Sequence, residues 1–176
     1  ILSCGAQKWL CSPWGSGFAY MRHELVAALE PPAAGWLAQA SSGDFGRFLD
    51  YDPAWHADAR KFEVGTIPYQ DIVGMNEALE LILALGPPRV EAHVRALTTE
   101  LLDWAQGAPG VRLLTPLVDE RRAGIVAFAT PDLDGDSAKL RAAKVTHSVR
   151  EGAIRLSPHF HNTMDEVETV IKAIGR

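Results

Sequence analysis

The strongest constraint on the fold is a helix break at Gly86-Pro87-Pro88, which separates two amphipathic segments in the middle of the chain. On each side of the break, apolar residues recur at spacings of three and four, which is the spacing of one helix face. Proline cannot continue a helix, so the sequence predicts two separate helices over residues 72–82 and 90–104. The inward residues are Ile72, Met75, Leu79 and Ile82 in the first helix, and Val90, Val94, Leu97, Leu101 and Trp104 in the second.

Composition limits the kind of protein that this chain can be. It has 176 residues, of which 47% are hydrophobic and 22% charged, and this balance is typical of a globular protein. With 17 Lys and Arg against 22 Asp and Glu, the net charge is −5, so we expect no nucleic-acid partner. No apolar run reaches the roughly 18 residues that cross a bilayer, so we expect no membrane partner. The two cysteines, Cys4 and Cys11, exclude a disulfide framework and favour a reducing, cytoplasmic compartment.

The chain after the two helices predicts a small α+β domain over residues 108–176, because short apolar runs alternate there with amphipathic stretches. Its expected elements are strands at 111–114, 124–129 and 153–157, a helix at 137–145, and a last helix opened by the capping box Thr163-x-x-Glu166, with Val167, Val170, Ile171 and Ile174 turned inward.

Before the two helices, apolar residues punctuated by Gly and Pro fill residues 1–22. We expect the end of a buried strand at Ile1–Leu2, a loop over 12–17 and a short strand over 18–21. Residues 31–62 are irregular, and a loop of this length is usually functional or covers another part of the fold. Because the chain opens inside an apolar segment and no signal peptide precedes it, we expect that it starts within a fold.

The densest cluster of chemistry surrounds Lys8, which lies between a strand end and the turn Gly15-x-Gly17. Apolar surroundings can desolvate a lysine, and a neutral amine is a nucleophile for carbonyl groups. Taken alone, a lysine is far more often a solvated surface residue, and a Gly-x-Gly pair is usually a turn. The cluster therefore needs support from elsewhere in the sequence.

Three further patches supply that support: FEVGTIP at residues 62–68, GAIRLSPH at 152–159, and HNT at 161–163. Together with GAQKWLCSPWGSGF at residues 5–18, they resemble the class V aminotransferases, which are fold-type I enzymes dependent on pyridoxal 5'-phosphate (PLP). That family includes cysteine desulfurases, selenocysteine lyases and isopenicillin N epimerase. The lysine segment is similar to the family pattern HKWL-x-G-P-x-G-x-G-F-L-Y, and the arginine segment is similar to I-R-x-S-x-H-x-Y-N.

The resemblance runs from Ser3 to the C-terminus and implies an α/β fold of type I. Residues 1–69 match a C-terminal remnant of the PLP-binding large domain, 70–107 match linking helices, and 108–176 match the small domain. Relatives hold the pyridine nitrogen with an aspartate and stack a ring on the cofactor, and both residues lie upstream of the lysine. We therefore expect that this chain alone neither holds PLP tightly nor catalyses.

The resemblance also implies roles for the residues around the lysine. Lys8 matches the lysine that forms the internal aldimine with PLP and shuttles the α-proton. Gln7 takes the place of a histidine beside the cofactor phosphate, where an amide can still donate a hydrogen bond. The serine that often binds phosphate is Gly5 here, and Ser3 is its possible stand-in.

Further site residues follow from the other patches. Thr66, after Gly65, matches a threonine that reaches the phosphate of the neighbouring subunit. Arg155 matches the arginine that binds the substrate α-carboxylate, although alone it could be an exposed arginine at a sheet edge. Trp14 is a candidate for lining the substrate pocket, and Asn162 completes the family pattern. We expect the tryptophans to be mostly core or covering residues: Trp9, Trp14, Trp36, Trp55 and Trp104.

The histidine and cysteine positions narrow the chemistry. His159 and His161 could suggest a metal pair, but neither a cysteine nor a carboxylate triad lies nearby, so we expect no metal site. Cysteine desulfurases carry a persulfide-accepting cysteine shortly before the arginine, and residues 132–149 contain none. We expect Cys4 and Cys11 to be buried small apolar residues. The absence of the persulfide-accepting cysteine argues against sulfur transfer and leaves transamination, epimerisation and β-elimination as candidate reactions.

The resulting hypothesis is the C-terminal half of a PLP-dependent enzyme that acts on an α-amino acid through Lys8. A non-catalytic assembly module and a desulfurase-like C–S lyase are its alternatives. We expect the N-terminal half as a separate or cleaved partner chain, because the helix faces carry more apolar surface than residues 108–176 can cover. We also expect a homodimer-like assembly, because the threonine patch would complete the neighbouring subunit's site.

Overall fold

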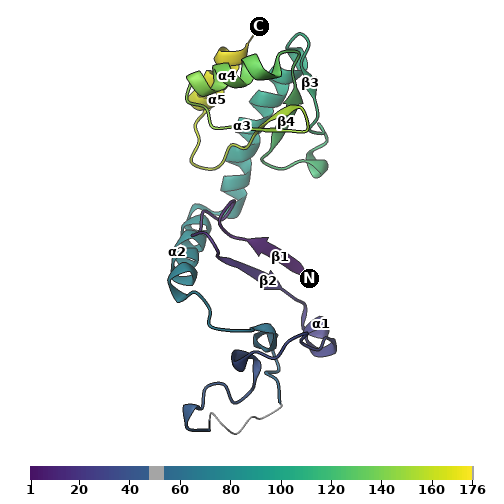
Figure 1. Cartoon of the computed structure of the whole chain (residues 1–176). Coiled ribbons are helices and arrows are strands. Elements are labelled where there is room, and N and C mark those ends of the chain that lie inside the picture. Colours follow the sequence, from purple (N-terminus) through teal and green to yellow (C-terminus); the bar gives the residue numbers. More distant parts are fainter. Residues whose placement is uncertain (48–53, 176) are drawn as a thin grey trace. The chain divides into compact units, whose positions relative to one another are not determined.

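The computed structural model describes residues 1–47 and 54–175, which form two compact units, Ile1–Ile82 and Leu83–Arg176. Residues 48–53 of the expected irregular segment, together with the last residue, lie outside the described part of the chain. Each unit contains its own antiparallel sheet (Figure 1). The expected three-part division of the chain stays a prediction.

In the described residues, the first unit contains a β-hairpin, a short helix, three 3₁₀ turns and a long helix. These elements are β1 (Leu2–Gly5), β2 (Gly17–Tyr20), α1 (His23–Ala28), η1 (Trp36–Ala38), η2 (Phe45–Arg47), η3 (Ala59–Phe62) and α2 (Tyr69–Leu85). The strands β1 and β2 of the hairpin lie side by side (Figure 1), and Cys4 pairs with Phe18 in their antiparallel register. A Cβ atom on Gly17 would lie 2.6 Å from the carbonyl oxygen of Cys4, so this register requires glycine at position 17.

The irregular segment of the first unit is held by backbone pairing across its described parts. Ala40 N donates to Ala54 O at 2.9 Å, and His56 N donates to Ala38 O at 3.0 Å. A Cβ atom on Gly35 would lie 2.4 Å from Cα of Val64, so the backbone before η1 passes directly against the FEVGTIP patch. This close approach positions the patch that carries the predicted phosphate contact.

The second unit is a four-stranded sheet with three helices packed against it. Its elements are α3 (Pro87–Gly107), β3 (Arg112–Leu113), η4 (Asp119–Arg121), β4 (Val126–Ala129), α4 (Leu133–Ala142), β5 (Ser148–Arg150), β6 (Ala153–Leu156) and α5 (Met164–Ile174). The strands run in the order β3-β4-β6-β5, and α4 and α5 lie side by side (Figure 1). β5 and β6 are joined by the two-residue turn Glu151-Gly152, in which both φ angles are positive, as such hairpins require.

The core of the second unit lies between the sheet and its helices. Alternate residues of a strand point to opposite faces, and one face of β4 and β6 is fully apolar. Val126 pairs with Leu156 and Phe128 with Ile154, and all four side chains are buried against the helices. The helices contribute Leu97, Leu101, Leu102, Leu140, Val167, Val170 and Ile174 to the same cluster.

Several sequence predictions are confirmed, and others need correction. α2 ends at Leu85 and α3 begins at Pro87, as the Gly-Pro-Pro break predicts. The helix expected at 137–145 lies four residues earlier at its start, because Asp132 caps it by accepting from Gly135 N. The sequence reading missed α1 and β5, which are too short to show a period. Ile1 and Leu2 are 71% and 53% exposed, so their expected burial within a larger fold stays a prediction.

The described residues contain no helix that combines the length and apolar character required to cross a membrane.

Candidate active site

Lys8 lies in a closed loop between β1 and β2. Ala6 N donates to Ser16 O at 3.0 Å, and Ser12 N donates to Ala6 O at 3.1 Å, so the loop is tied at its base. Inside it, Cys11 N donates to the carbonyl oxygen of Lys8 at 3.1 Å, and Cys11 itself has φ 54°. These bonds hold the backbone of the lysine, and its side chain is exposed.

The side chains near Lys8 differ in exposure. Lys8 and Ser3 are exposed and Gln7 is half-buried, so the described residues do not desolvate the lysine. A Cβ atom on Gly5 would lie 2.9 Å from Oε1 of Gln7, so the glutamine amide occupies the space that a side chain at position 5 would need. Ser12 is 8% exposed, and its hydroxyl has no hydrogen-bond partner among the described residues. The loop therefore offers an amine together with amide and hydroxyl donors.

The remaining predicted site residues of the first unit are at the surface. Thr66 is exposed, Gly65 is half-buried with open space around its Cα, and Trp14 is 83% exposed. Trp9 and Trp36 are also more than a third exposed, so the expectation that the tryptophans are mostly covered is wrong for these three. Trp55 and Trp104 are half-buried.

Arg155 lies on an inner strand of the second unit. β6 pairs with β4 on one side and β5 on the other, so the alternative of an arginine at a sheet edge is excluded. Arg155 pairs with Ala127 and Ser148, which places it on the face opposite the buried Ile154. Its side chain is half-buried between two small neighbours and has no ion pair with any described residue. The described residues therefore leave the guanidinium of Arg155 without an ion-pair partner.

A tight turn connects the arginine strand to α5. His159 N donates to Oδ1 of Asn162 at 2.8 Å, and Asn162 N donates back to His159 O at 3.0 Å. Thr163 N donates to Glu166 Oε2 at 2.8 Å, and Glu166 N donates to Thr163 Oγ1, which completes the predicted capping box. The backbone hydrogen bond from Thr163, then the side-chain bond from Asn162, lower the pKa of Glu166 below its usual 4.5. The side chain of Asn162, the residue that completes the family pattern, therefore helps to hold the turn between β6 and α5.

The cysteines differ from the sequence prediction. Cys4 is half-buried and Cys11 is exposed, so the expectation that both are buried is wrong. Cys11 adopts a left-handed backbone conformation in the loop, and its exposed Sγ lies 3.9 Å from the carbonyl oxygen of Trp9. A surface thiol in the lysine loop could not be read from the sequence, where Cys11 stands among apolar residues.

Comparison with known proteins identifies the family. The family model for class-V aminotransferases matches residues 1–170, and the chain therefore belongs to the class-V aminotransferase family, whose members are PLP-dependent enzymes. An uncharacterized aminotransferase of Bacillus subtilis, YcbU, is 30% identical over 175 residues, which cover 99% of this chain and 45% of that protein. Isopenicillin N epimerase of Streptomyces clavuligerus is 27% identical over 177 residues, with coverage of 95% and 44%.

Solved structures agree on the fold. The cysteine desulfurase CsdA of Escherichia coli matches with a TM-score of 0.76 at 19% identity, over 94% of this chain and 43% of that one. The chain thus has the fold of the C-terminal part of a fold-type I PLP enzyme, as the sequence predicted. It spans less than half the length of the relatives that it matches.

Proposed function

We propose that this chain supplies the cofactor-linked lysine and the carboxylate-binding arginine of a PLP-dependent enzyme acting on an α-amino acid. The observation that carries the proposal is the closed loop that presents Lys8 between β1 and β2. Transamination, epimerisation and β-elimination all begin with loss of the α-proton, so the proposal covers that shared step.

The donor set of the lysine loop fits PLP. Lys8 offers the amine for covalent attachment, and the amide of Gln7 fills the space beside Gly5 where a phosphate-binding side chain would otherwise stand. The hydroxyl of Ser12 is buried without a partner among the described residues, which is the state of a group that awaits a ligand. We assign Ser3, Gly65 and Thr66 to the surroundings of the phosphate.

The chemistry divides between cofactor and protein. When bound, PLP supplies an electron sink for the α-carbon of the substrate. Lys8 holds the cofactor and afterwards moves a proton at its Nζ atom. Arg155 binds the substrate α-carboxylate with its planar guanidinium, which orients the amino acid. Trp14 covers the substrate from the loop side.

We propose that further polypeptide completes the first unit and that the assembly is dimeric. The hairpin and α2 carry exposed apolar side chains, among them Leu2, Tyr20, Val73 and Leu81, and apolar patches of this kind mark interfaces. The chain also spans less than half of its relatives. Two free thiols, Cys4 and Cys11, favour a reducing, cytoplasmic compartment.

The decisive test of this proposal is Lys8→Ala. In the assembly with the polypeptide that completes the first unit, borohydride reduction of the PLP-loaded protein, followed by peptide mapping, should place the cofactor on the Lys8 peptide. The variant should lose the adduct and also the exchange of substrate α-protons in deuterated water. Lys172→Ala is the matched control, since Lys172 is an exposed lysine on α5. An adduct that persists in Lys8→Ala at the level of the control would contradict the assignment.

A second test addresses Arg155. Arg155→Ala should weaken amino-acid binding by about 2–5 kcal/mol, because a charged carboxylate loses its partner, while the cofactor spectrum stays unchanged. The comparison of an amino acid with the corresponding amine isolates the carboxylate, since only the amino acid should lose affinity. Arg112→Ala, an exposed arginine on β3, serves as the control. Equal losses for acid and amine would assign Arg155 a structural role instead.

A further inference from the structure

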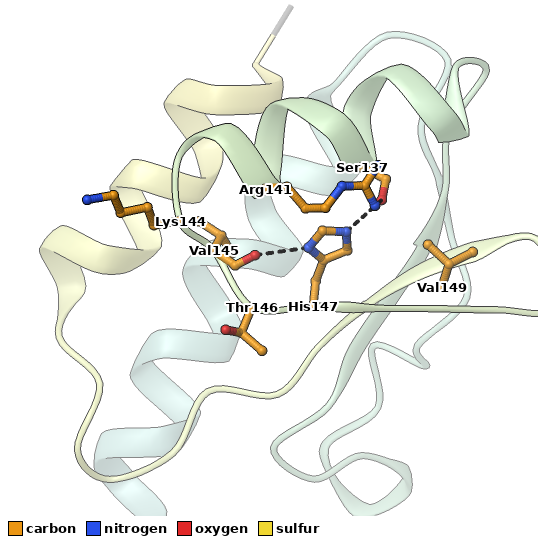
Figure 2. A pocket seen from close by; sticks show the side chains of 7 residues that line it. All are labelled: Ser137, Arg141, Lys144, Val145, Thr146, His147 and Val149. Atoms are coloured by element: carbon orange, nitrogen blue, oxygen red, sulfur yellow. Dashed lines mark hydrogen bonds between the residues drawn. The ribbon is translucent and has the colours of Figure 1, made fainter.

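The second unit contains a pocket that Arg155 does not line (Figure 2). It has a volume of about 480 Å³ and lies at the C-terminal end of α4, where Ser137 and Arg141, residues 144–147 and Val149 line it. None of these lining residues is acidic.

The pocket lies on the opposite face of the sheet from Arg155. In the pairing of β5 with β6, Val149 is opposite Ile154, and Ser148 is opposite Arg155. Ile154 is part of the core beneath the helices, so Val149, which lines the pocket, shares the helix-covered face. A ligand in this pocket would therefore not compete for the arginine that we assign to the substrate.

A chain of hydrogen bonds runs through the pocket and fixes one guanidinium. Nδ1 of His147 lies 3.0 Å from the carbonyl oxygen of Val145, which can only accept, so Nδ1 carries the proton. In the neutral ring, Nε2 then accepts from the hydroxyl of Ser137 at 2.7 Å. Ser137 Oγ in turn accepts from Nη1 of Arg141 at 2.9 Å (Figure 2). Ser137 is only 3% exposed, so this anchor is rigid.

The Nε and Nη2 atoms of Arg141 form no hydrogen bond with a described residue. The only hydrogen bond from the side chain of Arg141 to a described residue uses Nη1, and no described carboxylate forms an ion pair with this side chain. The Nε and Nη2 edge is the edge that binds two oxygens of a carboxylate or phosphate at once. Because the orientation of the side chain is already fixed, less conformational entropy is lost when such a group binds.

The surroundings favour an anion with two negative charges. Lys144 adds a second positive charge at the rim, where its exposed ammonium extends away from Arg141 (Figure 2). The carbonyl groups at the end of α4 do not oppose an anion strongly, because Lys144 N donates to Arg141 O and Val145 N donates to Leu140 O. The side chains of Val145 and Val149 give the pocket an apolar wall.

We propose that this pocket binds the phosphate group of a small phosphate monoester. Arg141 contacts two phosphate oxygens through Nε and Nη2, the exposed ammonium of Lys144 raises the positive potential at the rim without contacting the phosphate, and the organic part of the ester lies against the two valines.

The test is calorimetric titration of phenyl phosphate into the purified protein without PLP, because PLP is itself a phosphate monoester and would compete for the pocket; the variants below assign the binding to this pocket. Arg141→Lys keeps the charge and removes the two-oxygen edge, and should weaken binding about tenfold, the equivalent of one charge-assisted hydrogen bond. Ser137→Ala removes the anchor without changing the charge and should also weaken binding. Arg112→Lys, on an exposed arginine outside the pocket, should bind like the parent.

Two further arms keep the proposal open to contradiction. Circular dichroism establishes that each variant is folded, and Arg141→Gln replaces Arg141→Lys if that variant does not fold. Benzoate at the same ionic strength should bind more weakly than phenyl phosphate, because it carries a single charge. Tighter binding of benzoate, equal binding by the Arg141 variant and the parent, or no binding of phenyl phosphate to the folded protein would each overturn the proposal.

Discussion

The two units of this chain bury their apolar residues in very different ways. In the second unit, large side chains such as Phe128 and Leu140 are 0–1% exposed and form one cluster. In the first unit, the buried apolar side chains among the described residues are Ala6, Val26, Ala38 and Ile82. Its aromatic residues are largely open, and Tyr20 is 60% exposed.

The difference does not come from the composition of the strands. β2 has the sequence GFAY and β4 has the sequence VAFA, and both contain a phenylalanine. β4 lies inside a four-stranded sheet beneath three helices, whereas β2 has one neighbouring strand. Burial is thus decided by what packs on a strand from elsewhere in the sequence, and the second unit supplies its own cover.

The sharpest test of this contrast is a matched pair of phenylalanine substitutions. Phe128 is 1% exposed and its ring meets that of Trp104 edge-on at 5.3 Å, so Phe128→Ala should lower the free energy of unfolding by about 3–5 kcal/mol. Phe18 is 42% exposed, so Phe18→Ala should change the free energy of unfolding by roughly 0.5 kcal/mol or less. Urea denaturation monitored by circular dichroism measures both values, and similar losses would remove the contrast.

A smaller effect is expected at the start of α5. Thr163→Ala removes the hydroxyl that accepts from Glu166 N, and should lower the free energy of unfolding of the second unit by about 1 kcal/mol. Thr163→Ser keeps the hydroxyl and serves as the control. If the alanine variant unfolds at the same urea concentration as the serine variant, the cap does not stabilise this unit.

The smallest expected effect on the free energy of unfolding comes from the negative charge of Glu166 in the same capping box. The pKa of Glu166 is lowered in the folded state, so its contribution to stability is fully present above its ordinary pKa of 4.5 and is lost as the pH falls through the folded value. The parent should therefore be more stable than Glu166→Gln at pH 7, and this advantage should disappear in strong acid. Urea melts of both proteins between pH 3 and pH 7 measure the difference. A constant difference across this range would show that the charge of Glu166 does not contribute.

The sequence predicted the second unit well because its signals are local. The period of residues 90–104, the Gly-Pro-Pro break and the Thr163 capping box each act within a few residues, and all three are confirmed. The strands were harder to predict from the sequence, because β5 has only three residues and is defined by its pairing with β6. Its position becomes evident only when the Glu151-Gly152 turn is recognised as a hairpin turn.

For the candidate site, sequence patterns identified residues but not their surroundings. Lys8 and Arg155 were found through motifs, and their roles stay predictions. Two features of the loop depend on the hydrogen bonds between residues 6 and 16, which no sequence pattern encodes. They are the exposure of Cys11 and the position of the Gln7 amide, which lies where a side chain on residue 5 would stand. The network of Ser137, Arg141 and His147 was missed for a similar reason, since the serine and the histidine come from different elements.

The register between β5 and β6 sets a rule for how this chain can vary. Arg155 and Ile154 are neighbours on one strand: Ile154 lies in the core, and Arg155 lies on the opposite face of the sheet. The length of the two-residue turn before β6 sets this assignment of faces. Inserting a single residue upstream of Ile154 within β6 would exchange the two faces, placing a guanidinium in the core and an isoleucine on the open face. Insertions of even length would preserve the assignment. Among natural variants of this segment, length changes should therefore come in pairs of residues, a parity that can be read from gene sequences alone.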